Sequence, residues 1–192
     1  MNVSSPGTAG RRARSRLAIT AVAAAGLAAG FAICMNVVHY RTWALVPSVA
    51  FQPFQNASAL HTIPAAALIG GGSLACTVIV ARRGLPGTSQ ALLWAAAALA
   101  AMPLLVTPAV FVSLQGALAQ AGPTPELVER LVGADLALRA IPPVLQLLIL
   151  CLALLRVTSA PAGDGTGRGD VRAAGASAAR PEVPSGRPHD WS

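Results

Sequence analysis

The sequence predicts an all-α integral membrane protein, an antiparallel four-helix bundle with a disordered C-terminal tail. Three observations predict this class. Hydrophobic residues make up 54% of the chain and charged residues only 11%, whereas soluble domains carry roughly 25% charged residues. Four apolar runs are long enough to cross a hydrocarbon layer of about 30 Å as helices. The end of the chain, residues 157–192, is rich in Gly, Ala, Pro, Ser and Arg and has no apolar periodicity, which is typical of disordered chain.

Residues 1–16 form a basic segment ahead of the first predicted span. The segment ends in a cluster of Arg11, Arg12, Arg14 and Arg16. Residues 17–38 then carry no charge and form the first span. A cleavable signal peptide also begins with basic residues, but its apolar core is only about 7–15 residues long. We therefore favour a retained membrane helix.

A mixed stretch, residues 38–61, separates the first two predicted spans. It contains Tyr40 and Trp43, which are typical of the aromatic belt at a membrane interface. It also contains Pro47 and Pro53, which break or start helices. We expect this stretch to lie at the outer interface.

The second and third spans follow as a helical hairpin. The second covers about residues 62–81, and a hinge at residues 84–89 turns the chain back. The third covers about residues 90–119, where Pro103 and Pro108 are expected to kink the helix.

The fourth helix is predicted to start within residues 126–130, to span the membrane over residues 131–155 and to end at Arg156. The transmembrane domain is therefore expected to cover residues 17–156. One side of the membrane would carry Arg11, Arg12, Arg14, Arg16, Arg82, Arg83 and Arg156. The other would carry Arg41, Arg130 and Arg139 with the acids Glu126 and Glu129. The positive-inside rule then places both termini in the cytoplasm and the protein in the cell membrane.

Two other classes of protein are disfavoured. The net charge of +7 comes from Arg residues at the ends of apolar runs, without the interleaved aromatics of a nucleic-acid interface. Cys34, Cys76 and Cys151 lie singly within apolar runs, so neither a disulfide framework nor a zinc site is indicated. No metal or other cofactor is predicted.

Charged groups at membrane depth cost about 2.5–3.5 kcal/mol each on insertion scales, so those present are candidates for function. Asp135 and Arg139 are four residues apart and are able to pair on one helix face. Gln146 lies about three turns after Asp135 on the same face. The alternative is that Asp135 and Arg139 simply lie at the outer interface of a thinned bilayer.

Other polar residues cluster near the predicted outer end. His39 and His61 flank the outer stretch, and either is suited to act as a base near neutral pH. Together with Asp135 and Arg139, the predicted binding pocket holds Asn36, His39, Gln55, Gln115 and Gln146.

Three stretches resemble a group of four-helix bacterial membrane proteins that share a domain with anthrone oxygenases. FQPFQNASALHTIP is similar to that family's loop before the second helix. FVSLQGALA is similar to its V-P-x-N-x-x-L signature, with Ser113 in place of Pro and Gln115 in place of Asn. ERLVGADLALRAIP is similar to its W-x-x-x-N-x-x-R motif, with Val132 and Leu136 in place of Trp and Asn. Arg139 matches that motif fully.

The resemblance implies a membrane enzyme that acts on an apolar aromatic substrate, with His61 as the base and Arg139 stabilising an anion. The departures from the motifs favour a second hypothesis, a non-catalytic membrane protein. In that hypothesis, the protein binds a lipid, an apolar small molecule, a partner subunit or a second copy, and the Asp135–Arg139 pair holds the helices together.

Overall fold

The computed structural model describes residues 6–159, and in that range every regular element is a helix. Four helical segments are long and apolar enough to cross a membrane: Arg12–Leu45, Ser48–Arg83, Gln90–Ala121 and Pro125–Ser159. They contain 32 to 36 residues each, so each is roughly 48–54 Å long. That length exceeds the hydrocarbon layer of about 30 Å. The all-α prediction with four long apolar helices is confirmed.

The first segment is made of α1 (Pro6–Cys34), a π-helical turn η1 (Met35–His39), the short α2 (Tyr40–Thr42) and a 3₁₀ turn at Trp43–Leu45. Helix therefore continues through most of the stretch for which we expected mixed structure. The aromatic-belt prediction is also wrong, because Tyr40 and Trp43 are buried in the protein core.

The second segment is the single helix α3 (Ser48–Arg83). This helix begins well before the predicted span of residues 62–81, because the helical structure is interrupted only around Val46 and Pro47, and α3 continues through Pro53 and Pro64. A proline removes one backbone hydrogen bond, and membrane helices tolerate such losses where neighbouring groups compensate.

The predicted hinge at residues 84–89 is confirmed. Gly84 and Gly87 adopt positive φ angles of 67° and 73° there, a region that favours glycine. Ser89 then caps α4 (Gln90–Val106) by accepting a hydrogen bond from the Leu92 backbone N–H.

The third segment continues from α4 through a π-helical turn η3 (Thr107–Phe111) into α5 (Val112–Ala121). The fourth is α6 (Pro125–Asp135), a π-helical turn η4 (Leu136–Ala140) and α7 (Ile141–Ser159). Helix α7 therefore reaches beyond the predicted start of the tail at residue 157. The rest of the predicted disordered tail lies outside the described residues.

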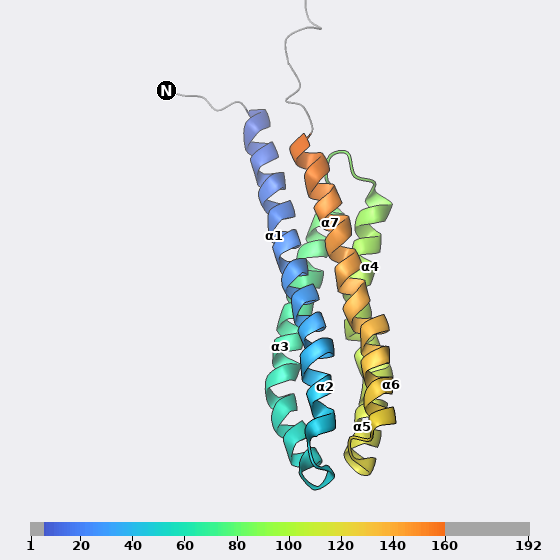
Figure 1. The fold of residues 1–192 in the computed structure, drawn as a ribbon. Helices are drawn as coiled ribbons and strands as arrows, with labels where there is room; N and C mark the ends of the chain where they lie inside the picture. Colours follow the sequence, from blue (N-terminus) through green and yellow to red (C-terminus); the bar gives the residue numbers. More distant parts are fainter. Residues whose placement is uncertain (1–5, 160–192) are drawn as a thin grey trace, which may run out of the picture. The chain divides into compact units, whose positions relative to one another are not determined.

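Each long helix packs against two neighbours. Helix α1 lies beside α3 and α7, and α4 lies beside the same two helices. As Figure 1 shows, the start of α1, the end of α7 and the turn between α3 and α4 lie at one end, while α2, α5 and α6 lie at the other. At that second end, Gly122 approaches the start of α3 so closely that an added Cβ atom would lie 2.8 Å from Ser48 Oγ.

Two separate clusters form the core between these ends. We call the first the alanine half: Ala18, Ala21, Ala25, Val80, Ala81, Leu85, Leu93, Ala96, Leu150, Ala153 and Val157. We call the second the aromatic half: Met35, Tyr40, Trp43, Phe51, Phe111, Leu114, Leu118, Val128 and Leu131. Small side chains let helices approach closely, so the two halves are packed by different means.

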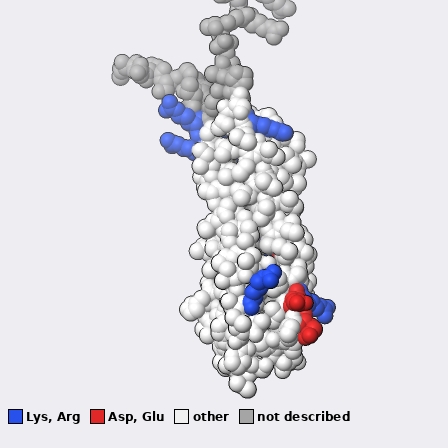
Figure 2. Space-filling model, in the orientation of Figure 1, with Lys and Arg blue, Asp and Glu red and all other residues white. Residues whose placement is uncertain are grey.

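The outer surface is apolar between two charged ends. Large apolar side chains such as Leu27, Leu68 and Leu105 are exposed. On the face drawn in Figure 2, charged residues gather toward the two ends and the middle carries none at the surface. Exposed apolar side chains between charged ends are compatible with a surface that contacts lipid.

Candidate functional site

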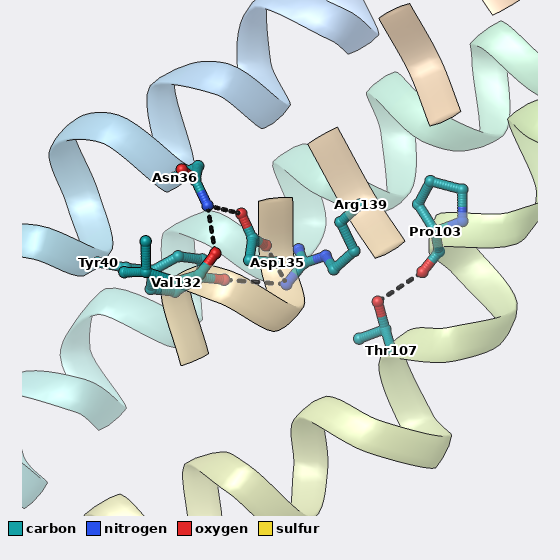
Figure 3. A network of polar contacts seen from close by, with 7 residues as sticks. All are labelled: Asn36, Tyr40, Pro103, Thr107, Val132, Asp135 and Arg139. Atoms are coloured by element: carbon teal, nitrogen blue, oxygen red, sulfur yellow. Dashed lines mark hydrogen bonds and ion pairs between the residues drawn. The ribbon is translucent and has the colours of Figure 1, made fainter. Parts of the chain in front are cut away.

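A buried polar cluster lies inside the aromatic half (Figure 3). Asp135 is 1% exposed and Asn36 is 3% exposed. The Asn36 amide Nδ2 donates to Asp135 Oδ2 at 3.1 Å and to the Val132 carbonyl oxygen at 2.8 Å. Asn36 therefore ties the first helical segment to the fourth through hydrogen bonds that satisfy a buried amide group.

Arg139 approaches Asp135 from the other side. Its Nη1 lies 3.3 Å from Asp135 Oδ1 and donates to the Tyr40 hydroxyl at 2.9 Å. Its guanidinium carbon lies 4.6 Å from the centre of the Phe111 ring, a cation–π arrangement. The two side chains therefore do form a pair; Asp135 is buried, and 14% of the Arg139 side chain is accessible.

Three π-helical turns surround this cluster. Asn36 belongs to η1, Phe111 to η3 and Arg139 to η4. A π-helical turn adds a residue to a helical turn, and such turns are frequent at functional sites. Three of the four helical segments are thus distorted where they contribute a side chain to one cluster.

Proline explains two of the three turns. Pro108 lies within η3, and Pro142 and Pro143 follow η4 after a single residue, Ile141. These residues lack the N–H groups that a regular helix would use. No proline stands within or beside η1, where the turn instead accompanies Asn36 and its bonds to the fourth segment.

Two cavities meet at Arg139. The inner cavity, about 70 Å³, has mostly apolar walls, with Asp135 and Arg139 at one level and Ser73 and Gln146 at another. It has room for on the order of five waters. The side cavity, about 260 Å³, lies along α3 and η3 and is also lined by Arg139. The two cavities share Met35, Ala66, Leu104, Thr107 and Arg139.

A second polar group lines the inner cavity nearer the alanine half. Gln146 Nε2 donates to Ser73 Oγ at 3.0 Å and to Thr77 Oγ1 at 2.8 Å. Gln146 is 0% exposed, and its Oε1 has no hydrogen-bond partner among the described residues. Asp135, Arg139 and Gln146, which are predicted to share one helix face, all line this inner cavity.

Three other predicted residues form a separate, smaller site. His39, Gln55 and Gln115 line a cavity of about 30 Å³. His39 Nε2 lies 3.1 Å from Ser58 Oγ, and Gln55 donates to the Gln115 carbonyl oxygen at 3.3 Å. This small cavity and the side cavity have five lining residues in common: Met35, Tyr40, Thr62, Ile63 and Gln115. Arg139 lines the side cavity and not the small one.

His61 does not join either group. It is exposed on α3 and is absent from the walls of the three cavities described above. The prediction places His61 at the start of the second span, beside an outer loop, whereas residues Ser48–Arg83 form one continuous helix and His61 is exposed on it. In the observed helix, the 100° turn per residue directs Ser58 and Thr62 inward and leaves His61 outside.

Several residues of the site escaped the sequence analysis. The sequence predicts Tyr40 as an interfacial aromatic residue and does not predict Phe111, Ser73 or Thr77 as residues of the site. The hydroxyls of Ser73 and Thr77 stand one turn apart in an otherwise apolar run, a signal that was available. The stacking of Phe111 on Arg139 depends on tertiary structure and leaves no local trace.

No group of three or more His, Cys, Asp or Glu residues suited to a metal ion occurs within the described part of the chain. Comparison with known proteins finds no matching family model, no similar curated protein and no similar solved structure.

Proposed function

We propose that the chain is a multi-pass protein of the cell membrane, an antiparallel four-helix bundle with both termini in the cytoplasm. Support comes from the length and apolar composition of its four helices. Further support comes from the exposed arginines Arg12, Arg14, Arg16, Arg82, Arg83 and Arg156. Arginine-rich ends of short loops face the cytoplasm.

Reporter fusions test this orientation. A reporter that is active only outside the cytoplasm should be silent when it is joined after Arg83 or after Arg156, and active when it is joined after Gly122. Activity after Arg83 or Arg156 would overturn the proposed orientation.

We further propose that the two cavities bind an apolar small molecule that presents a hydrogen-bond acceptor to Arg139. The observation that carries this proposal is the position of Arg139 at the junction of both cavities, with 14% of its side chain still accessible. Both of its polar bonds use Nη1. Nε and Nη2 make no hydrogen bond with the described residues, so donors remain for a ligand.

The charge of the cluster favours a neutral ligand. Asp135 already balances the Arg139 charge across 3.3 Å. A carboxylate ligand would bring a second negative charge close to Asp135, and two such charges repel each other strongly where water is excluded. A carbonyl group accepts the same hydrogen bonds without that repulsion. The apolar walls suit a largely hydrocarbon body.

Benzophenone is a suitable probe because it is an apolar ketone that, once excited by light, forms bonds to nearby C–H groups. In lipid nanodiscs, we expect saturable labelling of cavity residues such as Met35 and Leu104. Labelling of lipid-facing residues such as Leu68 should rise in proportion to concentration. Mass spectrometry of the labelled peptides distinguishes labelling of cavity residues from labelling of lipid-facing residues.

A charge-matched pair of variants gives the control. Arg139→Lys keeps the cation but removes the planar fork and its second donor edge, and it should weaken saturable labelling several-fold. Arg130→Lys changes an exposed arginine of α6 and should leave the saturable labelling unchanged. Labelling that never saturates, or that is equal in the two variants, would refute a ligand site at Arg139.

A second candidate is the membrane oxygenase that the sequence resemblance implies. It is favoured by the fact that Arg139, the residue that matches the motif, lines cavities suited to an apolar substrate. The exposure of His61 removes the base expected for such an enzyme. Oxygen uptake by the purified protein with a panel of aromatic ketones tests this candidate, and no uptake would exclude it for that class of substrate.

A further inference from the structure

We infer that the ligand carries a second polar group, a hydroxyl, which donates a hydrogen bond to Gln146 at the deep end of the inner cavity. This inference rests on the proposed ligand site and specifies its substrate class: an apolar molecule with a carbonyl at one end and a hydroxyl at the other.

The direction of the Gln146 amide follows from its neighbours. The Thr77 hydroxyl donates its only proton to the Ser73 carbonyl oxygen at 2.8 Å. Thr77 Oγ1 can therefore only accept, and Gln146 must turn its NH₂ group toward it. The remaining amide atom, Oε1, is then an acceptor that is buried and has no partner among the described residues.

An unpaired buried acceptor is costly, because burial removes its bonds to water and nothing replaces them. Gln146 lines the inner cavity, so a donor within that cavity is the natural partner. A water there would find few polar atoms besides Ser73 and Gln146, although a buried water typically makes about three hydrogen bonds. A hydroxyl on an apolar molecule needs only this one acceptor, and the hydrocarbon part of that molecule packs against the apolar walls.

The position of Gln146 sets the spacing of the two polar groups. It follows Arg139 by seven residues, roughly 10 Å along the helix axis. Beyond Gln146 and Thr77, the core continues with Val80, Leu150 and Ala153, which are buried in the alanine half. The cavity therefore ends at Gln146, and a ligand that enters at Arg139 would place its far end there.

The test compares benzophenone with para-hydroxybenzophenone in the photolabelling experiment. In the wild-type protein, the hydroxyl should lower the apparent Kd roughly 2- to 10-fold, the range expected for one hydrogen bond. In Gln146→Leu, the preference should reverse, because the hydroxyl would then be buried without a partner. Gln55→Leu, a half-buried glutamine of the small cavity, should keep the wild-type preference.

The outcomes separate this inference from the ligand site itself. Equal affinity for the two ketones in the wild-type protein, or an unchanged preference in Gln146→Leu, would overturn the inference and leave the Arg139 site standing. Saturable labelling by neither ketone would refute both. Saturable labelling of Gln146→Leu by benzophenone shows that the variant is folded. If Gln146→Leu is not folded, Gln146→Met takes its place, because methionine has a similar length and lacks the amide oxygen that would accept the hydrogen bond.

Discussion

The alanine half and the aromatic half are built from the same four helical segments but are packed in opposite ways. In the alanine half, Ala21 and Ala25 of α1 are fully buried among other small or aliphatic side chains. In the aromatic half, Tyr40, Trp43 and Phe51 stack edge to face, with ring centres 5.0 and 5.5 Å apart. Within residues 6–159, the ion pair between Asp135 and Arg139 lies in the aromatic half, beside Tyr40 and Phe111.

This difference indicates a division of labour within one bundle. Small side chains allow close helix packing, which leaves little room and little polarity. Bulky rings and π-helical turns hold the helices in less regular contact, and cavities remain beside Arg139. The alanine half is suited to fix the helices, and the aromatic half is suited to bind a molecule.

The largest effect should come from breaking the ion pair. Arg139→Ala leaves the Asp135 carboxylate buried without its cation, which typically costs about 3–5 kcal/mol. The double variant Asp135→Asn with Arg139→Gln should recover much of that loss, because no unpaired charge remains. Thermal unfolding of the wild type and these variants in detergent measures the loss of stability and its recovery. A near-neutral Arg139→Ala would contradict a structural role for the buried pair.

An intermediate effect should separate the two halves directly. Ala21→Leu adds volume where the helix is fully buried, and such overpacking costs about 1–3 kcal/mol. Ala66→Leu makes the same chemical change at a residue that lines both cavities, so the added atoms have space. It should cost well under about 1 kcal/mol.

The same unfolding assay compares the two leucine variants. Equal destabilisation would show that the aromatic half is as tightly packed as the alanine half. The photolabelling assay adds a second readout, since Ala66→Leu should reduce saturable binding of benzophenone while Ala21→Leu should not.

The smallest effect should come from Tyr40→Phe. This change removes the hydroxyl that accepts a hydrogen bond from Arg139 and keeps the ring that packs against Trp43. Loss of one such bond typically costs about 0.5–1.5 kcal/mol. Unfolding in detergent should detect the shift. A loss as large as that of Arg139→Ala would mean that Tyr40, and not Asp135, is the main partner of Arg139.

Much of the fold could be predicted from the sequence. The four apolar runs and the glycines of the hinge at residues 84–89 predict the long helices and the turn that joins two of them. The Asp135–Arg139 pair also followed from spacing alone, because residues four apart lie on the same helix face. These features depend on neighbours in the chain, so local patterns specify them.

The local sequence does not predict where α3 starts. Pro47 and Pro53 are both prolines, which locally disfavour a helix. Pro47 stands just before the first residue of α3, whereas Pro53 lies within α3. The effect of a proline depends on whether surrounding groups compensate for its missing N–H. That compensation belongs to the packed structure and not to the local sequence.

The sequence by itself determined four long apolar helices, arginine-rich ends and a pair of opposite charges on the last helix. Tertiary structure decided that Asn36 and Tyr40, far away in the chain, complete that cluster, that Phe111 stacks on Arg139, and that His61 points outward. The physical reason is that helix length and composition are set by consecutive residues. The direction in which each side chain points depends on where helices begin, where π-helical turns shift their phase and which neighbours they meet.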